Sequence, residues 1–352
     1  MDFSNSRTNR RAGMLLASFF VAAGTHATHA QETAPFYQNK TLTIGVGAAT
    51  GGGLDTYARL IARHIGAHIP GKPNVVVANM PGAGGQIVAR HMVNNAPKDG
   101  TFIATFFPSV LIDPLLNSGP RPVDPSVFGY VGNAKVEASV CMVRKDTGIK
   151  TLEELRSKTL TLGGTTTGSQ VVDFPTVEKN LLGVKFNLIP GYKGTREVGA
   201  AIERGEVQGI CGIGWSTLKV QYPTLLSGDM FGVMLAQEDV KGDQELNAAG
   251  VPSMYSLARN ETERQVLRVL YAQNDLGRPY AAPPGLPKDR LEILQKAFVS
   301  ALESKELRDD AAKMNIDVNV TTGDNMKKMV DELYSSSPDV VQGLKQALGR
   351  AN

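Results

Sequence analysis

The stretch TLTIGVGAATGGGLDTYARLIARHIG, residues 41–66, decides the fold. Apolar residues alternate along its first part and recur at helical spacing after the glycines, which indicates a strand that leads into a helix. The first N–H groups of a helix have no partner within it, and the helix dipole lies behind them. The glycine loop therefore predicts an anion site made of backbone, with Asp55 placed to cap the helix and order the loop.

A second strand–glycine–helix junction follows the first. NMPGAGGQIVARHM, residues 79–92, has the pattern of a strand end, a glycine turn and a new helix. Gly82, Gly84 and Gly85 permit the tight turn, and Asn79 can brace it. Because the carboxyl ends of adjacent parallel strands share one edge of a sheet, both loops are expected to face the same ligand.

Two further junctions lie in the middle of the chain. LTLGGTTTGSQVVDF, residues 160–174, places the hydroxyls of Thr165–Thr167 and Ser169 at a helix start, and LIPGYKGTREV offers Thr195 as a cap. Hydroxyls and helix N-terminal amides can hold a second anionic or polar group. The four junctions together predict a small carboxylate bound between two halves of the protein.

Short apolar runs alternate with helical patterns through most of the chain, which predicts α/β lobes with mostly parallel sheets flanked by helices. The run that follows DPSVFGYVGNAKVEAS and the segment DLGRPYAAPPGLP are interpreted as crossings between two lobes. The first lobe is then residues 31–138 with 278–352, and the second is the inserted segment 139–277. Lobes joined by two crossings can close on a ligand about a hinge. The predicted strands are Leu42–Val46, Asn74–Ala78, Thr101–Phe106, Ser139–Arg144, Thr159–Gly163, Lys185–Pro190, Val207–Cys211, Phe231–Leu235 and Pro279–Ala282.

The first thirty residues have the pattern of a secretory signal peptide. Arg7, Arg10 and Arg11 precede an apolar run over residues 12–24, and HATHA leads to a cleavage point after Ala30. The apolar run is too short to cross a bilayer, and a buried helix is the alternative interpretation. The sequence therefore predicts export and a soluble periplasmic protein.

The charge and the cysteine content of the chain limit the classes of protein to which it could belong. The chain has 37 Lys and Arg against 34 Asp and Glu, a net charge of +3, which argues against a nucleic-acid partner. Cys141 and Cys211 lie in separate apolar runs. They could form a disulfide in an oxidising compartment, or they could be two small buried apolar residues.

Enzyme and cofactor patterns are incomplete. A dinucleotide site needs an acidic residue near the end of the second strand, where this chain has Asn79, and a Walker loop needs Gly-Lys-Ser/Thr after the glycines. His64 and His68 share a helix face, but no further ligands at known spacing complete a metal site. No Gly-x-Ser-x-Gly elbow is present. We therefore expect no catalysis, no cofactor and no metal.

Four segments in this order carry a family resemblance: GGGLDTYARLIARHI, VVVANMPGAGG, APKDGTFIATF and IPGYKGTREVGAAIERGEV. They resemble the signatures of the Bug family, the extracytoplasmic solute receptors of tripartite tricarboxylate transporters. The resemblance covers about residues 40 to 240. It implies a two-lobe Venus-flytrap fold of the periplasmic binding protein type, a carboxylated ligand, and delivery by a monomer to membrane permease subunits.

The resemblance also implies which residues contact the ligand. Asp55 braces the first loop, and Tyr192 falls in a segment that is one glycine longer than the family pattern. Trp215 could line the cleft or could be a core aromatic residue. The full set of expected ligand-binding residues is Ala49, Thr50, Gly51, Gly52, Gly53, Asp55, Ala83, Gly84, Gly85, Ser109, Thr165, Thr166, Thr167, Gly168, Ser169, Tyr192, Thr195 and Trp215.

The chain departs from the family pattern after VPSMYSLA, where it inserts the helical segment NETERQVLRVLYAQND. The GIGWS segment lacks the acidic residue that suits an amino ligand in some relatives, which favours a di- or tricarboxylate or an aromatic acid without an ammonium group. Two other functions stay open at this point. One is a secreted enzyme that acts on a carboxylate, and the other is a ligand sensor for a membrane signalling protein.

Overall fold

The computed structural model describes residues 35–116, 123–223, 226 and 231–350. The predicted signal peptide lies outside these residues. Every predicted strand overlaps a strand of the structure, and two strands were not predicted: β4 (Gly129–Asn133) and the short β11 (Thr321–Thr322). β4 lies in the segment that precedes the first predicted crossing.

The first sheet has six strands in the order β11-β4-β10-β3-β1-β2. β1 pairs in parallel with both β2 and β3, whereas β10 is antiparallel to β3 and β4. The sheet is therefore mixed rather than mostly parallel, because the late strand β10 inserts between two early strands. Its other strands are β1 (Thr41–Val46), β2 (Asn74–Asn79), β3 (Phe102–Thr105) and β10 (Pro279–Ala282).

The second sheet has five strands in the order β7-β6-β8-β5-β9 and is also mixed. β6 is parallel to β7 and β8, and β5 is antiparallel to β8 and β9. All of its strands come from the middle of the chain, and Pro35–Asn352 form one compact unit. The exact lobe boundaries stay a prediction. The strands are β5 (Ser139–Arg144), β6 (Leu160–Gly163), β7 (Phe186–Ile189), β8 (Gly209–Gly214) and β9 (Phe231–Glu238).

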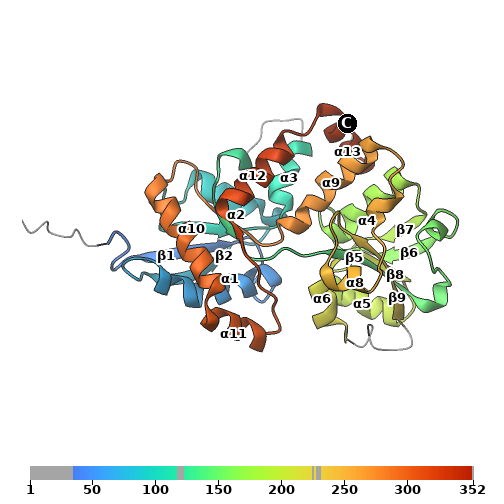
Figure 1. The fold of residues 1–352 in the computed structure, drawn as a ribbon, viewed down its shortest axis with the longest axis horizontal. Helices are drawn as coiled ribbons and strands as arrows, with labels where there is room; N and C mark the ends of the chain where they lie inside the picture. The colour runs from blue at the N-terminus through green and yellow to red at the C-terminus, as the bar shows by residue number, and fades with distance from the viewer. Residues whose placement is uncertain (1–34, 117–122, 224–225, 227–230, 351–352) are drawn as a thin grey trace, which may run out of the picture. The chain divides into compact units, whose positions relative to one another are not determined.

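Helices cover both faces of each sheet (Figure 1). Beside the first sheet lie α1 (Gly53–Ile65), α2 (Gln86–Asn94), α3 (Ser109–Leu116), α10 (Lys288–Glu303), α11 (Lys305–Lys313) and α12 (Gly323–Tyr334). Beside the second lie α4 (Gln170–Leu182), α5 (Thr195–Glu203) and α6 (Trp215–Gln221). Both α9 (Glu261–Asp275) and α13 (Pro338–Ala347) pack on α4, and α13 also contacts α3, while α8 (Gln244–Ala248) follows β9 in the chain. The inserted segment predicted to be helical is α9.

The alternation of side chains along the strands divides the apolar core. On β1, Leu42, Ile44 and Val46 face the cluster that contains α1, α10 and α11. On β5, Val140 and Met142 face α5 and α6. The opposite faces of both sheets share one continuous cluster, which also includes residues of α2, α3, α4, α9, α12 and α13. One body of apolar packing thus joins the two sheets.

Polar and sulfur groups lie inside the second sheet's core. Cys141 and Cys211, on adjacent strands, are joined by a disulfide bond. Next to it, the carboxyl groups of Glu178 and Glu238 are fully buried. The Tyr271 hydroxyl donates to Glu178 at 2.6 Å, and the backbone N–H of Gly212 donates to Glu238 at 2.5 Å.

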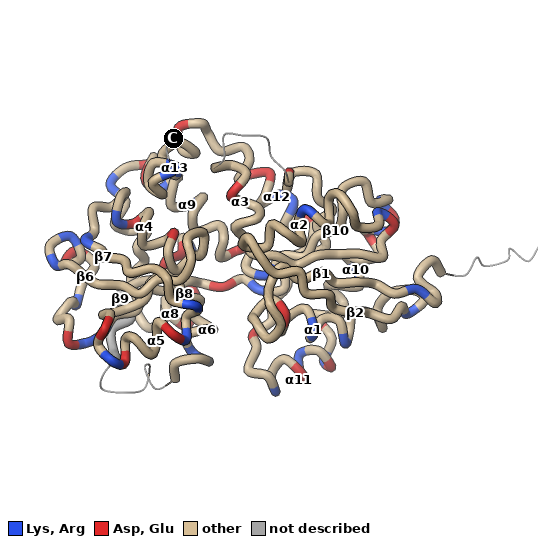
Figure 2. Tube along the Cα trace, turned by 180° about the vertical axis from the view of Figure 1, so that it is seen from behind, with Lys and Arg blue, Asp and Glu red and all other residues tan. Residues whose placement is uncertain are grey.

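The surface charges are mixed. Basic and acidic residues intersperse over the elements in Figure 2, and many form ion pairs along single helices, such as Lys305 with Asp309 at 2.6 Å. In the described part of the chain, no helix combines the length and apolar character that a bilayer crossing requires.

Candidate functional site

The loop between β1 and α1 is held by a buried carboxylate. Asp55 is 2% exposed and accepts hydrogen bonds from Gly51 N at 2.8 Å, Arg59 Nε at 2.9 Å and Asn79 Nδ2 at 2.9 Å. Burial alone raises the pKa of a carboxyl group, but these hydrogen bonds outweigh it and lower the pKa of Asp55. Asp55 thus orders the glycine loop, as predicted.

Asn79 braces a different loop from the one predicted. Its side-chain amide donates to Ala48 O at 3.0 Å and to Asp55, and its Oδ1 accepts from Thr50 Oγ1 at 3.2 Å. These partners belong to the first glycine loop, whereas the prediction assigned Asn79 to the second turn. The pairing of β1 with β2, which places Val46 opposite Asn79, explains the difference.

The turn between β2 and α2 requires glycine. Gly82, Gly84 and Gly85 have φ values of +125°, +61° and +93°, a region that side chains rarely adopt. A Cβ on Gly85 would approach Phe106 Cβ to 3.2 Å, while one on Gly84 would meet only Ser109 Oγ at 3.6 Å. A glycine at position 85 therefore allows close packing against Phe106, whereas the space beside Gly84 is not filled by any other residue that the structure describes.

The loop between β6 and α4 presents hydroxyl groups. Thr165 Oγ1 and Ser169 Oγ lie 2.8 Å apart, and Gly168 N donates to Asp173 Oδ1 at 3.1 Å. Ser169 is the N-cap residue of α4, but its side chain does not accept from the helix. The first turn of α4 is consequently left without a side-chain cap, which favours an external acceptor there.

The β2–α2 loop and the β6–α4 loop meet at a cavity of about 470 Å³. Gly84 and Ser109 come from the first sheet's side, and Thr166 comes from the second sheet's side. Half of the expected ligand residues line this cavity: Ala83, Gly84, Ser109, Thr165, Thr166, Thr167, Gly168, Ser169 and Thr195.

The other expected residues lie outside the cavity lining. The first glycine loop does not line the cavity, but Arg278 does, and its Nη2 would lie 3.1 Å from a Cβ on Gly53. The residues that do not line the cavity are Ala49, Thr50, Gly51, Gly52, Gly53, Asp55, Gly85, Tyr192 and Trp215.

Trp215 and Tyr192 are packing residues. Trp215, the first residue of α6, is 8% exposed in the core beside α5, and its Nε1 donates to Glu245 at 2.9 Å. Tyr192 packs against the same cluster, and its ring would contact a Cβ on Gly163 at 3.4 Å. Of the two interpretations of Trp215, the structure supports the core aromatic residue.

Several cavity residues were missed by the sequence analysis. Glu137 lies just before the first predicted crossing and Arg278 lies in the second, while Gln273 and Asn274 come from the last turn of α9. The predicted crossings were a usable signal, because a segment that joins two lobes must pass beside the space between them. The polar residues within those crossings could have been proposed as ligand contacts.

The cavity offers donors and few reactive groups. Glu137 accepts from Ser216 N at 2.8 Å and also from its hydroxyl, and Asp113 lies 3.6 Å from Arg350 Nη1. Burial raises the pKa of Asp113, and Arg350 opposes that effect. Among the described residues that line the cavity, none is a histidine or cysteine. The arrangement suits the binding of a polar or anionic molecule.

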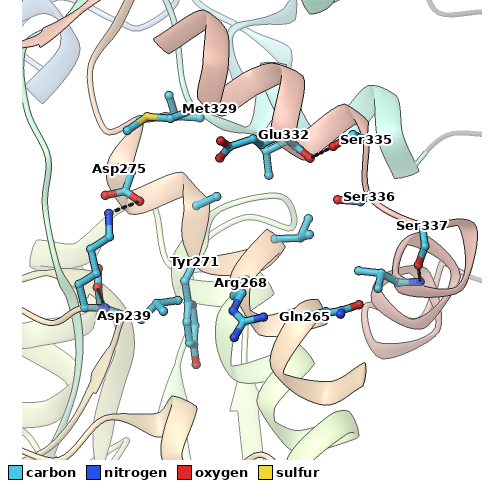
Figure 3. A pocket seen from close by; sticks show the side chains of 17 residues that line it. Asp239, Gln265, Arg268, Tyr271, Asp275, Met329, Glu332, Ser335, Ser336 and Ser337 are labelled. Atoms are coloured by element: carbon cyan, nitrogen blue, oxygen red, sulfur yellow. Dashed lines mark hydrogen bonds and ion pairs between the residues drawn. The ribbon is translucent and has the colours of Figure 1, made fainter. Parts of the chain in front are cut away.

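A second cavity, of about 520 Å³, lies between α9 and the connection from α12 to α13 (Figure 3). Its charged groups have partners: Arg268 donates to Glu261 at 2.8 Å, and Lys241 lies 3.9 Å from Asp275. Asp239 and Glu332 add further negative charge. This cavity contains none of the expected ligand residues and is electrostatically less suited to an acid.

The sequence of the chain is similar to parts of two known proteins. No protein-family model matches the chain. A UPF0065 protein from the gbd 5′ region of Cupriavidus necator is 30% identical over 206 residues, which is 57% of this chain and 61% of the relative. A UPF0065 protein from Agrobacterium vitis is 31% identical over 45% of this chain and 46% of the relative. The chain thus matches less than two thirds of the length of either relative.

Solved structures match over most of the chain. A TctC solute-binding protein from Polaromonas has a TM-score of 0.66 at 18% identity, covering 88% of this chain and 99% of that one. The periplasmic binding protein BugD has a TM-score of 0.63 at 20% identity, covering 88% and 98%. MatC from Rhodopseudomonas palustris, solved with bound malate, has a TM-score of 0.61 at 21% identity, covering 86% and 99%.

The chain therefore has the two-lobe α/β fold of periplasmic solute-binding proteins, which confirms the predicted fold class. Within that class, its structural neighbours are TctC and Bug proteins and its curated relatives are UPF0065 proteins, so the predicted resemblance to the Bug family is confirmed. The Polaromonas protein is a solute-binding protein and BugD is a periplasmic binding protein.

Proposed function

We propose that the protein is a periplasmic solute receptor that binds a small carboxylate in the 470 Å³ cavity. One observation carries the proposal: Gly84 and Ser109 from one sheet's loops and Thr165–Ser169 from the other's line the same cavity. Hydroxyl groups and uncapped helix starts on both sides suit an anionic ligand. The ligand class is a di- or tricarboxylate or an aromatic acid, and the malate found in MatC supports this class.

The cavity size is consistent with this class of ligand. Small-molecule sites in proteins commonly enclose about 300–1,000 Å³, and this one falls in the lower part of that range. The polar groups that line it come from several strand–helix junctions, which is where ligands bind in open α/β sheets.

We further propose that the receptor acts as a monomer and delivers the acid to the membrane permease subunits of a tripartite tricarboxylate transporter. The fold and the resemblance to the Bug family support this partner. The proposal predicts that cells lacking this receptor lose uptake of the acid that it binds and regain uptake when the gene is restored. Unchanged uptake would contradict delivery to a permease without contradicting binding.

Binding itself is tested by thermal unfolding. The protein is first unfolded and refolded, since lobe closure can retain an acid from the cells. A ligand that binds only the folded state raises the unfolding midpoint, by an amount that grows with its concentration above Kd. We expect at least one of malate, adipate, citrate and benzoate to raise the midpoint, whereas the corresponding neutral amides do not. No shift with any of these acids at millimolar concentration would contradict the proposal.

A further inference from the structure

Arg278 is a cavity residue whose charge has no ion-pair partner among the residues that the structure describes. It is the third residue after the end of α9 and directly precedes β10. Its Nη1 donates to Gly277 O at 2.7 Å, but its Nε is buried and has no hydrogen-bond partner among the described residues. No carboxylate oxygen in the described part of the chain lies within 4.0 Å of the guanidinium group.

The acidic residues of the cavity are engaged elsewhere. Glu137 accepts two hydrogen bonds from Ser216, and Asp113 lies beside Arg350. Neither forms an ion pair with Arg278. A guanidinium group that is partly removed from water without a counter-charge destabilises a protein, because hydration is lost and no Coulomb attraction replaces it.

The surroundings of Arg278 hold the guanidinium in place. Its central carbon lies 5.2 Å from the centroid of the Tyr57 ring, and Nη2 lies against Gly53, the first residue of α1. The positive end of the α1 dipole and the arginine thus lie together, and both favour an anion. Because a Cβ on Gly53 would come within 3.1 Å of Nη2, the glycine leaves the space that the arginine occupies.

We propose that Arg278 binds the carboxylate group of the ligand. This inference rests on the proposed function and identifies the charged contact in the cavity. A planar guanidinium group matches a carboxylate through two parallel N–H donors, which a lysine ammonium group cannot reproduce. The glycine loop of residues 49–53 then acts through Arg278: it orders the start of α1 and leaves room for the arginine, while the arginine contacts the acid.

The test compares affinities for acids and for their neutral amides. Wild-type protein, Arg278→Gln, Arg278→Lys and the control Arg264→Gln are refolded and titrated calorimetrically with malate, adipate and benzoate, and with malamide, adipamide and benzamide. Arg264 is an exposed helix residue that pairs with Glu261, so its variant removes one positive charge outside the cavity. We expect Arg278→Gln to weaken acid binding by about tenfold to a hundredfold. Arg278→Lys should fall between Arg278→Gln and wild type, and the control should match wild type.

A second readout does not depend on the ligand. If Arg278 is an unpaired charge in the empty protein, the ligand-free Arg278→Gln variant should unfold at the same temperature as wild type or higher. Two results have distinct meanings. Binding of no acid by wild-type protein would contradict the proposed function and the role of Arg278 with it. Acid binding by wild type that Arg278→Gln retains within twofold would overturn only the role of Arg278.

Discussion

The side-chain amide of Asn79 donates to the Asp55 carboxylate at 2.9 Å and so ties the end of β2 to the loop that follows β1. Asp55 Oδ2 also accepts from Gly51 N and Arg59 Nε. An ionised carboxylate can accept all these hydrogen bonds, whereas an amide of the same shape cannot. The first glycine loop is therefore held by one buried negative charge.

Replacing Asp55 by Asn should destabilise the protein by about 1–3 kcal/mol at pH 7, since a buried acceptor of charge-assisted hydrogen bonds is lost. The folded-state pKa of Asp55 is lowered, so its contribution is present above the unfolded-state pKa near 4 and is lost as the pH falls through the folded-state value. Urea unfolding at pH 7 and pH 3 measures both effects. The difference in unfolding free energy between wild type and the Asp55→Asn variant should be smaller at pH 3 than at pH 7. An equal difference at both pH values would contradict this role for the charge.

Gly84→Val should abolish acid binding, because its side chain would enter the cavity beside Ser109. Valine at the φ of +61° also costs about 1–2 kcal/mol of stability. Gly148→Val is a matched control: its φ is +63°, and a Cβ there meets nothing within 4 Å. Of these two variants, calorimetric titration should detect acid binding by Gly148→Val and not by Gly84→Val. Retained affinity in the Gly84 variant would remove this loop from the site.

The disulfide between Cys141 and Cys211 should stabilise the second sheet. The two residues are 70 apart in sequence. A cross-link over a loop of that size lowers the conformational entropy of the unfolded chain, which raises the free energy of unfolding by about 2–4 kcal/mol. Replacing both cysteines by alanine should lower the unfolding free energy by this amount, as measured by urea unfolding without reductant. Equal stability of the double variant and wild type would show that the bond does not stabilise the fold.

The buried pair Glu178 and Glu238 should make stability fall with rising pH. Burial raises the pKa of Glu178 from 4.5 to about 7, and burial together with the neighbouring Glu178 raises the pKa of Glu238. The folded protein then binds more protons than the unfolded chain between about pH 4.5 and 7, so the free energy of unfolding decreases across this window. The slope is about 1 kcal/mol per pH unit for each proton.

Glu178→Gln should reduce that slope between pH 5 and pH 8, because glutamine does not titrate and can still accept from Tyr271. Glu206→Gln is the control, since Glu206 is an exposed residue paired with Arg204. Urea unfolding at both pH values compares the three proteins. The same slope in wild type and Glu178→Gln would contradict the linkage.

Local patterns made most of the fold predictable. Each strand–glycine–helix junction is encoded within about fifteen residues, and the junctions at Gly51, Gly84, Gly168 and Gly194 all occur. Pairing between distant segments was not predictable from such patterns. β10, from residue 279, inserts between β3 and β4, and this changes a mostly parallel sheet into a mixed one.

The candidate site was also predicted only in part, because local patterns are visible in the sequence and contacts between distant segments are not. Hydroxyls and glycines at helix starts are visible in the sequence, so Gly84 and Thr166 were identified. Arg278 was not identified, because its importance depends on the lack of a nearby carboxylate among the described residues, which only the folded chain reveals. The partner of Asn79 likewise depends on the register of β1 against β2.

Mass spectrometry of the natively purified protein tests the central claim most directly. The cavity is proposed to hold a small carboxylate, so protein isolated without unfolding should release a carboxylic acid at up to one molecule per chain. Wild-type protein should carry the acid, and Gly84→Val should not, while Gly148→Val should resemble wild type. A bound molecule without an acidic group, or an acid that Gly84→Val retains equally, would contradict the account.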